Sequence, residues 1–240
     1  MTDRVKGVSY LQKGEGKDLV FFHGYLSSKE AFSAQIAYFS RFYRVTAFDF
    51  LGQGQSEGLL FPFSVEDYAV WTEGILAELG VLQPTVIAHS FGCRVAVKMA
   101  KRRGQVFDKI ILTGPAGVVF PRGIRYRIRV KAYRFMKKIA PNFAEKHFGS
   151  AEYRTLSGVM RESYKKIVNE DLRGDAATIE NQVLIIQGNK DSVTPMREAE
   201  AYVSVMRNAR ISVMEGGHFA FAENPVSFNI LVEEFLQDVR

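Results

Sequence analysis

The chain has 240 residues, of which 47% are hydrophobic and 24% are charged, the ordinary mixture of a globular protein with a large core. A chain of this length is routinely one domain, so we expect a single domain over residues 1–240. One cysteine, Cys93, excludes an internal disulfide, and no stretch approaches the roughly 18 apolar residues of a membrane span. With no apolar signal segment after the first charged residues, we predict a cytoplasmic protein with no transmembrane segment.

The formal net charge of +6 is unevenly distributed. Residues 115–175 contain 14 Lys and Arg against six Asp and Glu, which leaves the rest of the chain slightly acidic. A nucleic-acid partner is therefore not expected, because the basic charge belongs to one segment and no nucleic-acid-binding motif accompanies it. The four histidines are scattered and the glycine loop at 52–54 lacks the phosphate and dinucleotide fingerprints, so we predict no metal and no cofactor.

Short apolar runs alternate with segments of helical spacing along the first half of the chain. Strands are predicted at residues 18–22, 43–48, 85–88 and 109–113, with one further strand near residues 5–11. Helices are predicted at residues 29–39, 64–79 and 91–103, the second of them capped by Ser64.

The alternation returns after the basic segment. Strands are predicted at residues 182–187 and 209–214, a helix opens at Thr194-Pro195 with proline in its first position, and a last helix runs from Asn224-Pro225 to about residue 237. This order predicts an α/β fold with a mostly parallel sheet covered by helices on both faces. Residues 115–175, which are mostly helical in pattern, are predicted to be an insertion between the two halves of the sheet.

The segment Ala88-His89-Ser90-Phe91-Gly92 lies between a predicted strand and a predicted helix. It matches the nucleophile-elbow pattern G-x-S-x-G with alanine in place of the first glycine. Small residues are needed there because a strand-to-helix turn this sharp leaves no room for larger side chains. An ordinary strand-to-helix turn is the alternative; for His89, packing beside the elbow is the favoured interpretation.

Three further pieces follow predicted strands, at the sheet edge where open α/β sheets hold their sites. Tyr25 and Phe91 would supply two backbone amides for an oxyanion hole. Asp191 and His218 would complete a catalytic triad, because a serine hydroxyl needs a histidine base and the histidine needs an orienting carboxylate. Each piece alone could be a plain turn or loop cap, but together they favour a triad of Ser90, Asp191 and His218.

These motifs resemble the α/β-hydrolase superfamily from residue 18 to the C-terminus, with most similarity to compact bacterial serine hydrolases of the esterase type. The order Ser, Asp, His is that superfamily's order, residues 49–56 resemble its D-x-x-G-x-G-x-S loop, and Asn224-Pro225 resembles the start of its last helix. The resemblance implies an α/β-hydrolase fold. With only one strand expected before residue 18, the family's first strand would be absent.

In this superfamily an insertion at residues 115–175 is a helical lid that governs substrate choice. Basic residues alternate with apolar ones there and predict a basic amphipathic helix, in which Arg125, Arg127 and Arg129 are candidate substrate-binding residues. Those arginines would attract an acidic acyl carrier, an anionic acyl thioester or a membrane surface. A solvated lid exterior is the alternative, and His147 in the same segment is expected at the surface.

The predicted activity is hydrolysis of a carboxylic ester or thioester, a small-molecule substrate, through an acyl-enzyme on Ser90. A carbon–carbon bond hydrolase or lyase on the same triad is an alternative that the sequence does not distinguish. A non-catalytic binding protein of the same fold is the other alternative, although a binding role does not require Ser90, Asp191 and His218 together.

Overall fold

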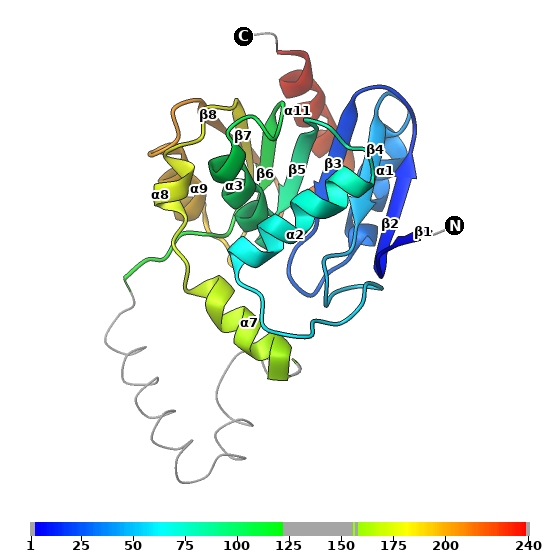
Figure 1. Ribbon diagram of the computed structural model, residues 1–240. Coiled ribbons are helices and arrows are strands. Elements are labelled where there is room, and N and C mark those ends of the chain that lie inside the picture. The colour runs from blue at the N-terminus through cyan, green and yellow to red at the C-terminus, as the bar shows by residue number, and fades with distance from the viewer. Residues whose placement is uncertain (1–2, 122–155, 157, 239–240) are drawn as a thin grey trace.

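The computed structural model describes residues 3–121, 156 and 158–238. Within these residues eight strands form one sheet in the order β1-β2-β4-β3-β5-β6-β7-β8 (Figure 1). β1 pairs with β2 and β2 with β4 in antiparallel fashion, and every pairing from β4 to β8 is parallel. The strands are β1 (Asp3–Val5), β2 (Val8–Lys13), β3 (Asp18–Phe22), β4 (Arg44–Phe48), β5 (Thr85–His89), β6 (Ile110–Thr113), β7 (Val183–Gly188) and β8 (Ala209–Met214).

The N-terminal segment differs from the sequence expectation, because it forms two strands where one was predicted. β1 and β2 are a hairpin in which Val5 pairs with Val8 across Lys6 and Gly7, both with positive φ (49° and 75°). Two consecutive positive φ angles are typical of the tight turns that suit hairpins. A three-residue strand is too short to show alternation in the sequence, so the expectation that the family's first strand is absent is wrong.

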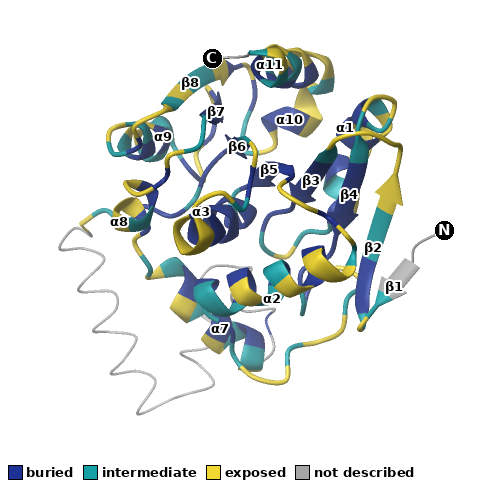
Figure 2. Ribbon diagram, turned by 45° about the horizontal axis from the view of Figure 1, so that its top comes forward, coloured by how far each residue is buried: buried dark blue, intermediate teal, exposed yellow. Residues whose placement is uncertain are grey.

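The described helices other than α7 form two layers, one on each face of the sheet (Figures 1 and 2). α2, α3, α8 and α9 pack on one face, and the 3₁₀ helix η1 with α1, α10 and α11 packs on the other. The predicted fold class is confirmed. The helices within the described residues are η1 (Lys29–Phe32), α1 (Ser33–Phe39), α2 (Val65–Glu78), α3 (Phe91–Arg103), α7 (Gly158–Val168), α8 (Arg173–Ala176), α9 (Met196–Val203), α10 (Ala220–Glu223) and α11 (Pro225–Gln237).

Local signals explain where these elements begin and which face they present. Ser64 caps α2 by accepting a hydrogen bond from the Asp67 amide, and the Asp67 side chain accepts one from the Ser64 amide in return. In β3, Val20 and Phe22 face the core under α2 and α3, whereas Leu19 and Phe21 face the core under α1 and α11. All four side chains are buried, as expected for a parallel sheet covered on both faces.

The chain reverses its direction of travel across the sheet next to β3. It passes from β3 to β4 on one side and then returns to β5 on the other side of β3, after which β6, β7 and β8 follow in order. In open α/β sheets, ligands bind where the strand order reverses, outside the carboxyl ends of the strands. A ligand site is therefore expected at the turns that follow β3 and β5. No helix in the part of the chain described above is long and apolar enough to span a membrane.

Candidate active site

Ser90 occupies the turn between β5 and α3 in a conformation that non-glycine residues rarely adopt. Its φ is 50° and its ψ is −105°, a backbone strain that costs on the order of 1–3 kcal/mol. The turn is held by the Ser90 amide, which donates to the Thr113 carbonyl (3.2 Å), and by the Ser90 carbonyl, which accepts from the Cys93 amide (3.1 Å). Strain that the surroundings enforce at one serine is a reason to look for function there.

The small residues of the elbow have a direct steric cause. A Cβ added to Gly92 would collide with the carbonyl oxygen of Phe22 in β3. Ala88 is fully buried in β5, where it pairs with Phe22 on one side and Leu112 on the other. The first turn of α3 thus lies directly against the sheet, which places Ser90 at the N-terminus of the helix, where negative charge is favoured.

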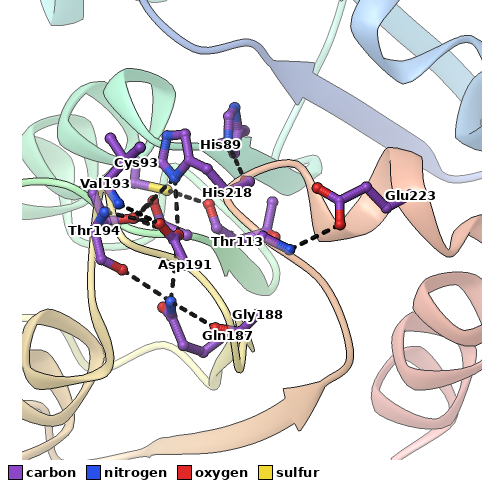
Figure 3. A network of polar contacts seen from close by, with 12 residues as sticks. His89, Cys93, Thr113, Gln187, Gly188, Asp191, Val193, Thr194, His218 and Glu223 are labelled. Carbon is purple, nitrogen blue, oxygen red and sulfur yellow. Dashed lines mark hydrogen bonds and ion pairs between the residues drawn. The ribbon is translucent and has the colours of Figure 1, made fainter.

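Asp191 and His218 come from the loops that follow β7 and β8, and the structure brings them together. His218 Nδ1 lies 2.8 Å from Asp191 Oδ2 (Figure 3). The Asp191 side chain is fully buried and the His218 side chain is 11% exposed. A buried carboxylate that accepts from Nδ1–H leaves the lone pair of His218 on Nε2, the arrangement that a histidine base requires.

The surroundings of Asp191 keep its carboxylate ionised. Oδ1 accepts from the amides of Val193 (2.8 Å) and Thr194 (2.9 Å), and Oδ2 lies 2.8 Å from Thr194 Oγ1. Burial alone would raise the pKa of Asp191, but the hydrogen bonds from His218 and Thr194 outweigh it and lower the pKa to about 2. The charge opposite His218 is therefore permanent at neutral pH.

The turn that follows β6 lies beside all three predicted triad residues. The Ala116 amide donates to the Ser90 carbonyl (3.4 Å). A Cβ at Gly114 would lie 3.2 Å from Asp191 Oδ2 and 3.3 Å from His218 Nδ1, so only glycine leaves the pair undisturbed here. This one turn thus contacts the main chain of Ser90 and lies against the Asp191–His218 pair.

The two predicted oxyanion-hole residues also lie next to each other. The rings of Tyr25 and Phe91 are in contact, with centroids 5.4 Å apart. Among the described residues, neither backbone amide has a hydrogen-bond acceptor. Tyr25 follows β3 and Phe91 follows Ser90, so these two free donors come from the two sides of the point where the strand order reverses.

Comparison of the sequence with known protein families identifies the family of this chain. Residues 18–160 match the family described as alpha/beta hydrolase fold, and residues 162–240 match a family described as TAP-like protein. The first match covers more than half of the chain. The chain belongs to the alpha/beta hydrolase fold family. It is accordingly a member of a family of hydrolases.

Individual relatives of this alpha/beta hydrolase are distant but cover most of its length. The AB hydrolase superfamily protein YisY of Bacillus subtilis is 27% identical over 92% of this chain and 92% of its own. The 2-hydroxymuconate semialdehyde hydrolase of Pseudomonas putida is 26% identical over 81% of this chain and 77% of its own. The structure of an esterase from Exiguobacterium antarcticum superimposes with a TM-score of 0.78 at 21% identity, over 96% of each chain, which supports the fold.

The loop at residues 49–56 of this alpha/beta hydrolase has a structural role that the motif alone did not reveal. Fully buried Asp49 accepts from the Lys29 amide (2.7 Å), the Lys29 ammonium (3.0 Å) and the Gln55 amide (2.9 Å). The folded loop presents Gln53, whose Oε1 accepts from the Leu26 amide (2.8 Å). Asp49 therefore shapes the loop, and Gln53 in turn holds the residue next to Tyr25.

α7, which lies within the basic segment of residues 115–175, contacts the same region. The Tyr25 hydroxyl donates to the Met160 carbonyl (3.2 Å), and the Tyr25 ring lies 5.5 Å from that of Tyr164. Ser163 fixes α7 to the preceding loop by exchanging hydrogen bonds with the Phe63 amide and carbonyl (3.0 and 2.6 Å). Arg125, Arg127, Arg129 and His147 lie outside the described residues.

Two polar residues of the site escaped sequence reasoning. Gln53 occupies a variable position of the glycine loop, and Thr194 fits a helix cap. Thr194 does not cap α9, whose cap position is Pro195 rather than the predicted Thr194, so proline precedes the helix instead of opening it. The Thr194 hydroxyl instead lies between Asp191, His218 Nδ1 (3.1 Å) and the Gly114 carbonyl (3.0 Å). In the described part of the chain, no group of three His, Cys, Asp or Glu residues is placed to hold a metal.

Proposed function

We propose that this chain is a serine hydrolase that cleaves a carboxylic ester or thioester through an acyl-enzyme on Ser90. The observation that carries the proposal is the buried Asp191–His218 pair, 2.8 Å apart, at the sheet edge where Ser90 holds a strained turn. An imidazole that faces a permanently ionised carboxylate can take a proton from a nearby hydroxyl, because the carboxylate stabilises the imidazolium that forms.

In the first half of the reaction, Ser90 Oγ attacks the substrate carbonyl carbon while its proton passes to His218 Nε2. The carbonyl π bond opens, and the oxyanion accepts hydrogen bonds from the Tyr25 and Phe91 amides, whose donors have no acceptor among the described residues. Asp191 stabilises the imidazolium. The intermediate then collapses: the bond to the alcohol or thiol breaks, and that group leaves with the proton from Nε2.

In the second half, water attacks the acyl carbon and gives a proton to Nε2. The same amides hold the second oxyanion, the bond to Ser90 Oγ breaks, and Oγ takes the proton back as the acid departs. Exposed apolar side chains adjoin the site residues in sequence and favour an apolar acyl group; they are Leu26 (45% exposed), Val193 (64%) and Phe219 (45%).

A carbon–carbon bond hydrolase is the second candidate. The observation in its favour is the relative from Pseudomonas putida, named for a 2-hydroxymuconate semialdehyde, a substrate name that contains no ester. The same Ser90, His218 and oxyanion amides would serve, with a carbon in place of oxygen or sulfur as the leaving atom. A lyase on the same residues and a non-catalytic binding protein are the remaining alternatives.

The proposal extends to the organisation of the chain. Residues 115–175 would form a lid inserted within one domain of residues 1–240. Arg125, Arg127 and Arg129 would bind an acidic acyl group or an acidic acyl carrier at the mouth of the site. A cytoplasmic location, the absence of nucleic-acid partners and the absence of a cofactor are parts of the same proposal.

The decisive experiment pairs a fluorophosphonate probe with a substrate panel. The probe should label wild-type protein and fail to label Ser90→Ala. The panel contains 4-nitrophenyl esters of increasing acyl length, acyl thioesters and a vinylogous 1,5-diketone, which reports carbon–carbon cleavage. Ser90→Ala and His218→Ala should each reduce kcat by about three orders of magnitude or more, and the double variant should lose little further.

Two control variants make the result specific. Ser227→Ala changes an exposed serine on α11, and Asp108→Asn changes an exposed carboxylate at the opposite edge of the sheet. Both should keep wild-type activity. Retention of more than a tenth of activity in Ser90→Ala would show that the nucleophile is elsewhere. If the protein cleaves the diketone and none of the esters or thioesters, a carbon–carbon bond hydrolase replaces the ester hydrolase as the proposed function.

A further inference from the structure

His89, the residue before Ser90, is a buried imidazole whose two nitrogens have different surroundings. Its Nε2 lies 2.9 Å from the backbone carbonyl oxygen of His218 (Figure 3). A carbonyl oxygen only accepts hydrogen bonds, so Nε2 carries the proton and donates it. His89 is 1% exposed and therefore does not touch substrate. It contacts the machinery through the main chain of His218.

The other nitrogen fixes the protonation state. Nδ1 is buried and has no hydrogen-bond partner in the described part of the chain. A second proton on Nδ1 would be a buried donor without an acceptor, which is strongly disfavoured. Burial, and next the neighbouring His218 ring, lower the pKa of His89 to about 3. The ring is thus a neutral imidazole with its single proton on Nε2.

The His89 ring is closely packed by its neighbours. A Cβ at Gly24, in the turn before Tyr25, would lie 2.9 Å from His89 Nδ1, so the ring occupies the space that this glycine leaves open. The rings of His218 (4.6 Å between centroids), Phe219 (5.0 Å) and Phe221 (4.9 Å) enclose it. A ring held this tightly can hold a neighbouring main chain in place.

We propose that His89 is a positioning residue for the hydrolytic reaction: its Nε2–H donates to the His218 carbonyl and fixes the main chain from which the His218 imidazole projects. The inference rests on the proposed function, because it assigns His218 as the base. β8 ends at Met214, so His218 lies in a loop. The hydrogen bond from His89, the last residue of β5, to the His218 carbonyl ties that loop to the strand that immediately precedes Ser90. His89 thereby links nucleophile and base through the backbone.

Two substitutions separate this role from packing. His89→Gln keeps an N–H donor near the position of Nε2 but removes the ring. His89→Phe keeps a ring of similar size but removes the donor. If donation to His218 is what matters, His89→Gln should keep kcat within about threefold of wild type, whereas His89→Phe should lose about 10- to 100-fold in kcat with little change in KM. A packing role alone predicts the opposite ranking.

The assay is hydrolysis of 4-nitrophenyl butyrate, with fluorophosphonate labelling rates as a second measure of the Ser90–His218 pair. Thermal unfolding establishes that each variant is folded. A structural readout accompanies them: the far-downfield proton resonance of His218 Nδ1–H, hydrogen-bonded to Asp191. It should persist unshifted in His89→Gln and shift or broaden in His89→Phe.

Each outcome bears on one proposal or the other. If wild-type protein neither labels nor turns over any substrate, the proposed function fails, and the resonance of His218 still tests the link to His89. If wild-type protein is active and His89→Phe matches or exceeds His89→Gln in kcat, the positioning role of His89 is refuted while the proposed function stands. An unshifted resonance in a folded His89→Phe variant refutes it equally.

Discussion

Replacement of Thr194 by valine tests how far the Asp191–His218 pair depends on a neighbour that touches both. Thr194 Oγ1 lies 2.8 Å from Asp191 Oδ2, 3.1 Å from His218 Nδ1 and 3.0 Å from the Gly114 carbonyl. The residue is 4% exposed. Valine keeps the branched shape and replaces the hydroxyl by a methyl group, so the change removes hydrogen bonds with little loss of packing.

The size of the effect follows from these contacts. A hydrogen bond to a charged group contributes about 1.5–3 kcal/mol, and the hydroxyl shares one proton between Asp191 and Gly114. We expect the free energy of unfolding of Thr194→Val to fall by about 2 kcal/mol, which for a chain of this length lowers Tm by roughly 4–8 °C. If the variant loses about 1.4 kcal/mol of the stabilisation of the Asp191–His218 ion pair in the transition state, kcat falls roughly tenfold. KM should change little.

The assay is steady-state ester hydrolysis from pH 5.5 to 8, with thermal unfolding of the same samples. Even a complete return of the Asp191 pKa from about 2 to its ordinary value of 3.8 would leave the carboxylate ionised over this range, so the fold loss in kcat should be independent of pH. Thr72→Val is the matched control, because the buried Thr72 hydroxyl has no hydrogen-bond partner among the described residues. It should keep wild-type kcat and Tm. A wild-type kcat in Thr194→Val, or a loss that deepens toward acid pH, would refute the reasoning.

Three further predictions follow from single contacts. The pKa of Asp191 is lower in the folded state (about 2) than its ordinary 3.8, so the folded state binds fewer protons between these values. Its stabilisation of roughly 2 kcal/mol should be present above pH 4 and lost as the pH falls to 2, and urea midpoints of Asp191→Asn should lack this acid dependence. Gln53→Met removes the acceptor of the Leu26 amide and should lower kcat about tenfold in the ester assay, at unchanged KM. Tyr25→Phe removes the bond to the Met160 carbonyl and should cost about 1 kcal/mol in urea unfolding, with fluorophosphonate labelling retained because the Tyr25 amide is unchanged.

The parts of the fold that could be predicted are those encoded by neighbours in the chain. The boundaries of α3 (Phe91–Arg103) and β8 (Ala209–Met214) match the prediction because apolar spacing and glycine turns mark them locally. Asp191 and His218 could be placed at one sheet edge for the same reason: each follows a buried strand, and the carboxyl ends of parallel strands share an edge. The hydrogen bond between them is a consequence of that edge.

The parts that could not be predicted depend on register between distant segments. Thr194 is three residues from Asp191 and beside a proline, a pattern that a helix start explains equally well. Its contact with Gly114 depends on the pairing of β6 with β7, which local periodicity does not encode. The donation from His89 to the carbonyl of His218 likewise joins residues 129 positions apart. Sequence patterns predict which edge of the sheet holds the candidate residues, whereas the hydrogen bonds that support those residues are visible only in the packed structure.

The electrostatics of the site bear on the choice between ester and carbon–carbon cleavage. Asp191 faces donors from His218, Thr194 and the Val193 amide, so in the proposed reaction its charge would persist while His218 gained and lost a proton. Both proposed reactions would need that charge pair, because in both we propose that Ser90 is deprotonated as it attacks. They differ at the leaving atom: an alkoxide or thiolate takes its proton from Nε2 directly, whereas a carbanion leaves only if a conjugated carbonyl stabilises it. An ester hydrolase should therefore release 4-nitrophenol from simple esters in an initial burst followed by slower deacylation, and should leave the diketone intact.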